Sequence, residues 1–130
     1  MTREELKATA LAMRERSYSP YSRFRVGAAL ECSDGTVFTG CNVENAAFGP
    51  TICAERTAVA KAVSEGRRDF VRIAVAGDSK APCVPCGVCR QVLREFAPEI
   101  EIICLGTNGE EKTMSLNDLL PHSFGPEFLV

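Results

Sequence analysis

Apolar residues alternate along the chain between helical spacing and short continuous runs. Leu6 and Ala10 lie one helical turn apart, and Thr2 with Glu5 matches a capping box, which predicts a first helix over about residues 4–16. Short apolar runs between turn residues predict five strands. These strands span about residues 25–32, 37–42, 70–76, 101–105 and 112–114.

Three more helices are predicted between and after these strands. One begins near Cys53, with Thr51 as a candidate N-cap, and ends before Gly66. Its small residues form one close-packing stripe: Ala54, Ala58 and Ala62.

The remaining two helices lie in the second half of the chain. One runs from about Cys86 to Phe96, and its spacing predicts that Val88, Val92 and Phe96 face inward. The last is short, from Ser115 to about residue 120.

The order of these elements, α-β-β-α-β-α-β-β-α, predicts the fold class. Asp34-Gly35 and Asn108-Gly109 are hairpin turns, so the strand pairs at the two ends are antiparallel. Strand–helix–strand crossovers imply a parallel central portion. We therefore predict an α/β fold, a three-layer α/β/α sandwich around a five-stranded mixed sheet, in one domain spanning residues 1–130.

Composition narrows the class of protein. A net charge of −2 argues against a chain that grips nucleic acid through its phosphates, and no apolar run approaches membrane-spanning length. We thus expect no nucleic-acid or membrane partner. Seven cysteines is an odd number, and no apolar leader follows Met1, so we expect a cytoplasmic protein with thiols or metal ligands rather than disulfides.

Three of the cysteines have the spacing of a zinc site. Cys86 and Cys89 lie one helical turn apart directly after Pro85, and Cys53 lies at the start of the preceding helix. Three thiolates leave the fourth tetrahedral position open for water, as catalytic zinc sites do. Glu55, two residues after Cys53, is placed to move protons. A cysteine two residues before a glutamate, followed by P-C-x-x-C, is the signature of the zinc nucleobase deaminases.

Charge is a difficulty for this cluster, because three thiolates on a divalent ion leave a net charge of −1. Helix N-termini favour thiolates, and a guanidinium can hydrogen-bond a sulfur. Arg56 and Arg90 are both candidates for this second role, and the sequence does not choose between them.

The other cysteines leave one alternative open. Cys83 precedes Cys86 by three residues, so Cys83 with the three proposed ligands would also make a closed, non-catalytic four-thiolate site. Three cysteines in predicted strands are most simply core residues: Cys32, Cys41 and Cys104. His122, the only histidine, is expected at the surface.

Motifs over nearly the whole chain resemble those of the small, homotetrameric cytidine deaminases. The matching stretches are Tyr18-Ser19-Pro20-Tyr21-Ser22, Gly40-Cys41-Asn42-Val43-Glu44-Asn45-Ala46, Cys53-Ala54-Glu55-Arg56, Pro85-Cys86-Gly87, Cys89-Arg90-Gln91 and Leu119-Leu120-Pro121 with Phe124. The resemblance implies one Zn²⁺ per chain. It also implies hydrolytic deamination of cytidine and 2′-deoxycytidine to the uridine forms with release of ammonia, in pyrimidine salvage.

The same resemblance implies roles for individual residues. Asn42 and Glu44 would hold the ribose 3′-hydroxyl with Val43 between them, and Phe24 would line the base pocket. Backbone groups at Ala54 and Val84 would contact the pyrimidine, and Arg56 would tune the thiolates. Phe124 would reach into the site of a neighbouring subunit of a homotetramer.

Two departures from the family pattern and two rival activities remain. Val84 stands where a small hydroxyl residue is usual, and the tail ends at Val130. A deaminase of another nucleoside or of a nucleoside-like antibiotic is disfavoured by Asn42 and Glu44. A deaminase of RNA or DNA is disfavoured by Glu44, whose carboxylate would repel phosphate.

Overall fold

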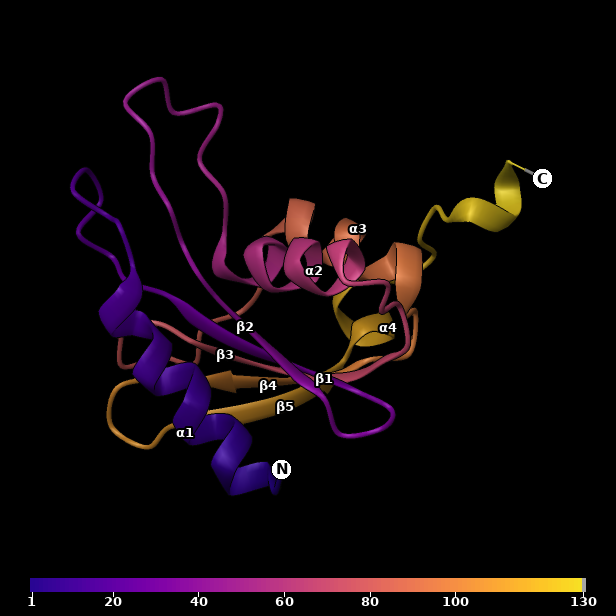
Figure 1. Cartoon of the computed structure of the whole chain (residues 1–130), viewed down its shortest axis with the longest axis horizontal. Helices are drawn as coiled ribbons and strands as arrows, with labels where there is room; N and C mark the ends of the chain where they lie inside the picture. The colour runs from indigo at the N-terminus through magenta and orange to yellow at the C-terminus, as the bar shows by residue number, and fades with distance from the viewer. Residues whose placement is uncertain (130) are drawn as a thin grey trace.

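The computed structural model describes residues 1–129, which form a five-stranded sheet between two helical layers (Figure 1). In chain order the helices are α1 (Arg3–Met13), α2 (Ala54–Ser64), α3 (Gly87–Phe96) and α4 (Leu116–Leu119), with 3-10 turns at Arg14–Arg16 and Pro126–Phe128. The strands are β1 (Gly27–Cys32), β2 (Val37–Cys41), β3 (Phe70–Ala76), β4 (Glu101–Leu105) and β5 (Glu111–Ser115). The predicted three-layer α/β/α class is confirmed.

Strand order in the sheet is β2-β1-β3-β4-β5. Both hairpin pairs are antiparallel, as predicted. The parallel portion is smaller than predicted, because only β3 and β4 pair in parallel. β1 lies between β2 and β3 and is antiparallel to both. All six residues of β1 are buried, as expected for a strand that has neighbours on both sides and helices over both faces.

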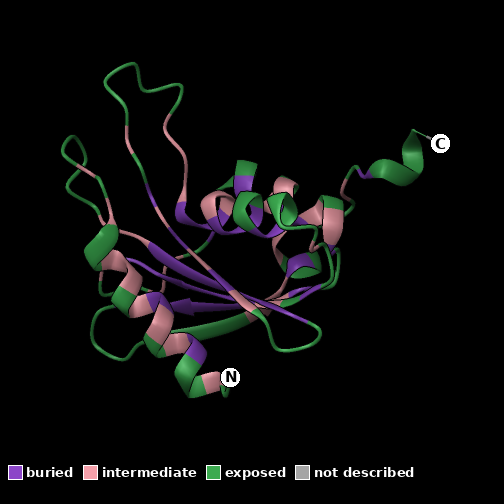
Figure 2. Cartoon of the chain, in the orientation of Figure 1, coloured by how far each residue is buried: buried purple, intermediate pink, exposed green. Residues whose placement is uncertain are grey.

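Each face of the sheet has its own apolar core. On one face, α1 buries Leu6 and Ala10 against Ala29, Ala74 and Ile103. α2 and α3 cover the other face, where the predicted small-residue stripe of α2 is fully buried. In Figure 2 the inner strands of the sheet are mostly buried, whereas the loops around residues 20 and 45 are mostly exposed.

Two glycines allow the helices to approach the sheet closely. A Cβ at Gly27 would lie 2.1 Å from the Ala10 carbonyl oxygen of α1. A Cβ at Gly40 would lie 2.2 Å from the Ala54 carbonyl oxygen, at the first residue of α2. Gly40 thus lets the start of α2 press directly onto β2.

Two local predictions about helices α2 and α3 are wrong. Cys53, not Thr51, is the N-cap of α2, and the Thr51 hydroxyl instead accepts a hydrogen bond from the Asn45 backbone at 3.1 Å. Val88 is 57% exposed, whereas Cys89 and Leu93 are buried. Burial of the Cys89 sulfur fixes the rotation of α3 and turns Val88 outward.

The capping predictions at the other two helices are confirmed. Thr2 and Glu5 form a complete capping box on α1, and Ser115 with Asp118 forms another on α4. Across residues 1–129, none of the helices is both long and apolar enough to span a membrane.

Candidate active site

The starts of α2 and α3 bring three cysteine sulfurs together. Cys53 is the N-cap of α2, Cys86 is the N-cap of α3, and Cys89 lies in the first turn of α3. Their Sγ atoms all lie within 4.8 Å of one another, and Cys53 Sγ is 3.8 Å from Cys86 Sγ. Two sulfurs bound tetrahedrally to one zinc ion, each at ~2.3 Å, would lie roughly 3.8 Å apart. The cluster therefore has both the donor atoms and the size that a zinc ion requires.

The helix starts also favour the thiolate form. The Cys89 backbone N–H points toward Cys86 Sγ at 3.5 Å. Hydrogen bonds from Cys89, and then from Arg56 and Cys86, lower the pKa of the Cys53 thiol to about 5 against the opposing effect of burial. At least one sulfur of the cluster is therefore negatively charged at neutral pH.

Arg56, rather than Arg90, contacts the cluster. Arg56 Nη2 donates to Cys53 Sγ at 3.3 Å, and Arg56 Nε is buried without a hydrogen-bond partner among residues 1–129. Arg90 instead donates to the carbonyl oxygens of Pro85 and Leu119, each at 2.8 Å. The Arg90 guanidinium therefore binds backbone carbonyls, and the Arg56 guanidinium is the one that lies within hydrogen-bond distance of a cluster sulfur.

Glu55 follows Cys53 into the first turn of α2 and is only 4% exposed. Burial raises the pKa of its carboxyl group to about 7. A carboxyl group with such a pKa can both accept and give up a proton near neutral pH. The close contact at Gly40 fixes the start of α2, and with it the direction of this side chain.

A cavity of about 200 Å³ opens beside the sulfurs. Its walls include six residues predicted for the site: Asn42, Cys53, Ala54, Glu55, Val84 and Cys86. Cys83, considered above as a fourth thiolate, also contributes to the lining, and three residues that the sequence did not assign to the site complete it: Val26, Thr51 and Ile52. Sequence patterns do not show these because their roles depend on which loops meet in space.

Asn42 lies in this cavity wall, and its side chain is largely occupied by contacts within the chain. Its Oδ1 accepts hydrogen bonds from the Val26 backbone at 2.9 Å and from the Ser17 hydroxyl. Its Nδ2 donates to the Phe24 carbonyl oxygen at 2.8 Å, which leaves one N–H for a ligand. Asn42 therefore fixes the segment around Phe24 whether or not a ligand is present.

Glu44 lines a second cavity of about 300 Å³, which shares Thr51 with the first. Its carboxylate accepts hydrogen bonds from the Tyr21 and Ser22 backbones, at 2.9 and 3.1 Å, and from the Ser22 hydroxyl. The hydroxyl of Ser22 contributes most to a lowered pKa of Glu44. The carboxylate is therefore held as a charged acceptor at the cavity edge.

The other three predicted substrate residues, Phe24, Val43 and Phe124, line neither of these two cavities. Val43 is exposed and pairs through its backbone with Ile52, at 3.0 Å in both directions. Phe24 is partly exposed, and its ring is so near Gly77 that a Cβ there would lie 3.1 Å from Phe24 Cζ. Phe124 lines neither cavity of its own chain.

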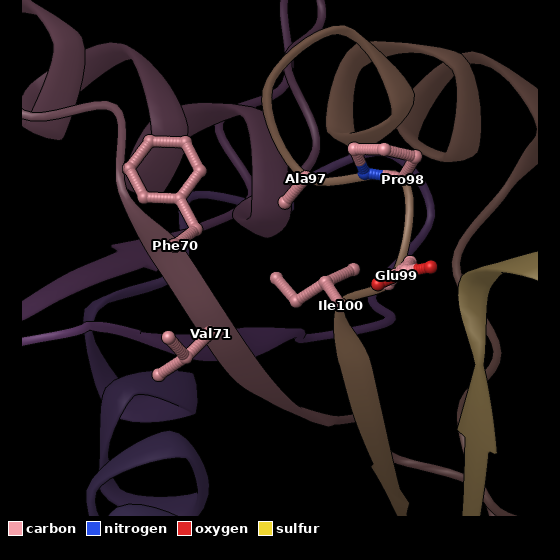
Figure 3. Close-up of a pocket in the computed structure, with 6 residues that line it drawn as sticks. All are labelled: Phe70, Val71, Ala97, Pro98, Glu99 and Ile100. Carbon is pink, nitrogen blue, oxygen red and sulfur yellow. The ribbon is translucent and has the colours of Figure 1, made fainter.

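A third pocket, of about 300 Å³, lies away from the cluster where α3 leads into β4 (Figure 3). Glu99 is the only ionisable residue in its lining, and none of the predicted site residues contributes to it. The cavity at the starts of α2 and α3, together with the second cavity that Glu44 lines, is therefore the candidate active site.

Fold and site together define a class: an α/β/α sandwich in which three thiols at two helix starts adjoin a buried carboxyl group. The family model described as "Cytidine and deoxycytidylate deaminase zinc-binding region" matches residues 1–107. The chain belongs to the cytidine deaminase family.

Individual relatives agree with this assignment. The cytidine deaminase of Halalkalibacterium halodurans is 51% identical over 98% of this chain and 97% of that protein. The cytidine deaminase of Sporosarcina psychrophila is 46% identical over 97% of this chain and 93% of that protein. The crystal structure of cytidine deaminase from Burkholderia pseudomallei superposes with a TM-score of 0.92 at 48% identity, covering 95% of this chain and all of that one.

Proposed function

We propose that this chain catalyses the hydrolytic deamination of cytidine and 2′-deoxycytidine, releasing ammonia and leaving the uridine forms, in the salvage of pyrimidines in the cytoplasm. The observation that carries the proposal is the position of Glu55. Its buried carboxyl group shares one cavity with two of the three clustered thiols, Cys53 and Cys86. Curated relatives named cytidine deaminase, at up to 51% identity, support the same activity.

Cys53, Cys86 and Cys89 would hold one zinc ion, and the contact from Arg56 would offset part of their negative charge. Bound there, zinc would supply an open coordination position at which the pKa of water is lowered. A closed four-thiolate site has no need of a buried carboxyl group at this point, so Glu55 favours the catalytic interpretation.

Glu55 would act as the proton shuttle of the reaction. Deamination replaces the amino group at C4 of the pyrimidine with oxygen from water, which requires a proton at the ring nitrogen and another on the departing ammonia. With a pKa of about 7, the Glu55 carboxyl group can take up a proton from water and deliver it at each step.

The remaining residues predicted for the site would hold the nucleoside. Glu44, kept charged by its contacts with Ser22, would accept a hydrogen bond from a sugar hydroxyl, and the free N–H of Asn42 would donate one to a sugar oxygen. Phe24 would border the base, and backbone groups of Ala54 and Val84 would contact the pyrimidine edge.

Because Phe124 lies outside its own cavities, we also propose a homotetramer in which this ring reaches a neighbouring site. Exposed apolar side chains near the cavity rim support such an assembly, among them Tyr18, Tyr21, Val43 and Phe48.

The first experiment is to incubate the purified, zinc-loaded chain with cytidine or 2′-deoxycytidine and to follow ultraviolet absorbance and ammonia release. Absence of turnover with zinc bound would contradict the proposal. A panel of other nucleosides identifies the preferred substrate, and salt-dependent binding of an oligonucleotide would point instead to a polynucleotide substrate.

Glu55→Gln tests the shuttle directly. The amide has nearly the same shape but cannot accept a proton, so turnover should fall by ~10²–10⁴-fold while about one zinc per chain remains bound. Both quantities are measured on one preparation. Activity near that of the unsubstituted chain would remove Glu55 from the mechanism.

A further inference from the structure

Side chains on one face of α3 hold the segment that follows α4. Gln91 Nε2 donates to the Phe124 carbonyl oxygen at 2.9 Å, and Arg94 Nε donates to the Ser123 hydroxyl at 2.7 Å. Arg94 Nη2 also forms an ion pair with Glu127. The segment around Phe124 is thus attached to α3, the helix whose start carries two of the three clustered thiols, Cys86 and Cys89.

The ion pair closes over Gly125 and makes a packed turn. Gly125 is buried, and a Cβ there would lie 2.3 Å from Glu127 Oε1 and 2.5 Å from Arg94 Nη1. The Phe128 backbone N–H donates to the Gly125 carbonyl oxygen at 3.1 Å. The Arg94 side chain is only 12% exposed, whereas that of Glu127 is 56% exposed, so the arginine is held by its packing and the carboxylate closes over it from the solvent side.

The turn presents two aromatic rings. Phe124 and Phe128 stack with centroids 5.3 Å apart and planes 18° apart, yet they remain 55% and 64% exposed. In Figure 1 this segment projects from the body of the molecule, on the side of the α2–α3 layer away from the loop between β2 and α2. Stacked rings that stay exposed on a braced turn are suited to contact another molecule.

We propose that Arg94 is a positioning residue: with Glu127 closed over Gly125, it presents the stacked Phe124–Phe128 pair as a preformed arm to the active site of a second copy of this chain. The inference rests on the proposed homotetramer, in which Phe124 crosses to a neighbouring site. An arm that is already ordered loses less conformational entropy on docking than a mobile one, so the clamp increases nucleoside affinity without touching the nucleoside.

The test separates the chain that supplies the arm from the chain that supplies the site. The site donor is Phe124→Ala, which keeps its own site but lacks the ring. The arm donor is Glu55→Gln, which keeps the arm but cannot shuttle protons. The two are mixed, dissociated and reassembled, and the mixed assemblies are isolated by affinity tags of different kinds. KM and kcat for cytidine are measured together with zinc content and mass by light scattering.

Phe124→Ala alone should raise KM by about fivefold or more, because stacking on a base contributes on the order of 1–3 kcal/mol. Reassembly with Glu55→Gln should restore the lower KM at part of the sites. An arm donor that also carries Arg94→Met, or the milder Glu127→Gln, should leave KM at those sites about three- to tenfold higher, with kcat nearly unchanged.

The matched control is an arm donor carrying Glu55→Gln with Arg67→Met. It loses two ion pairs of an arginine with a carboxylate, to Asp34 and to Asp69, at a site outside the arm. This donor should restore KM as fully as Glu55→Gln alone.

Each other outcome has a definite meaning. If arm donors with and without Arg94→Met restore KM equally, the inference is overturned. It is also overturned if neither Arg94→Met nor Glu127→Gln enters the assembly, since Arg94 would then act in assembly rather than in presenting the arm. An unchanged KM for Phe124→Ala removes the crossing ring but leaves the deaminase activity standing. No turnover of cytidine by the unsubstituted, zinc-loaded chain would instead contradict the proposed function itself.

Discussion

Burial raises the pKa of two residues that line the same cavity, Glu55 and Cys83, but with different consequences for their protonation at neutral pH. It raises the pKa of Glu55 to about 7, within reach of a proton exchange at neutral pH. It raises the pKa of the Cys83 thiol to about 12, so that this thiol stays protonated. The three sulfurs that converge on one point are those of Cys53, Cys86 and Cys89, whereas the Cys83 sulfur packs against Gly77.

Cys83→Ala should therefore retain about one zinc per chain, because the Cys83 sulfur lies outside the cluster of three sulfurs that would hold the ion. Zinc is measured after removal of free metal, and Cys89→Ala serves as the control that should lose it. Loss of the metal from Cys83→Ala as well would support the closed four-thiolate site.

At the scale of elements, the segment from Phe24 to Val26, which reaches the cavity wall at Val26, is held from two sides. Asn42 binds the backbone of both of these residues, and Asp78 binds Arg25 between them. Asp78 Oδ2 accepts from the Arg25 backbone N–H at 2.8 Å and from Arg25 Nε at 2.9 Å. The hydrogen bond from the Arg25 side chain is the main cause of a lowered pKa of Asp78.

Asp78→Asn should loosen this wall because the amide keeps the shape but loses the charge that holds Arg25. We expect KM for cytidine to rise by about two- to tenfold, with a smaller change in kcat. The loosened segment would weaken binding of the substrate and of the transition state to a similar extent.

Asp34→Asn is a matched control for Asp78→Asn, because Asp34 is also bound by an arginine, Arg67, but lines neither active-site cavity. If both variants change KM equally, the effect is one of general stability. Steady-state kinetics at saturating zinc distinguishes the two cases.

At the scale of the whole molecule, Arg67 joins two distant stretches of chain. It forms ion pairs with Asp34 in the β1–β2 hairpin and with Asp69 just before β3, at 2.9 and 3.0 Å. It also donates to the Thr36 hydroxyl at 3.1 Å. The Arg67 guanidinium holds the pKa of both carboxyl groups well below the usual range.

Arg67→Met should lower the melting temperature by about 2–4 °C at pH 7, because two exposed carboxylates lose their partner. Both carboxyl groups have a lower pKa when folded than when unfolded. Their contribution is therefore complete above the unfolded value of ~3.9 and is lost as the pH falls through the folded values.

The difference in melting temperature between Arg67→Met and the unsubstituted chain should consequently shrink below about pH 4. Thermal denaturation over a pH series measures it, with Arg68→Met as a control in the exposed neighbouring residue. A difference that stays constant from pH 7 to pH 3 would show that the ion pairs do not cause it.

The sequence by itself determined the elements and the chemistry of the cluster. Capping at Thr2 and Ser115, the bounds of β3 and β4, and the spacing of Cys86 and Cys89 by one helical turn all follow from short-range rules. The motif indicated that Cys53 joins them, and the fold brings its sulfur to the other two. Hydrogen bonds within one helical turn and the spacing of ligands on one helix depend on neighbouring residues only, so a linear pattern contains them.

Only the tertiary structure decided what depends on distant parts of the chain. It placed β1 between β2 and β3, turned Val88 outward, and directed Arg56 rather than Arg90 to the sulfurs. It also closed Arg94 over Gly125 to brace the aromatic arm. Each of these results from packing and hydrogen bonds between segments far apart in sequence, where several partners satisfy the same local pattern and burial selects one of them.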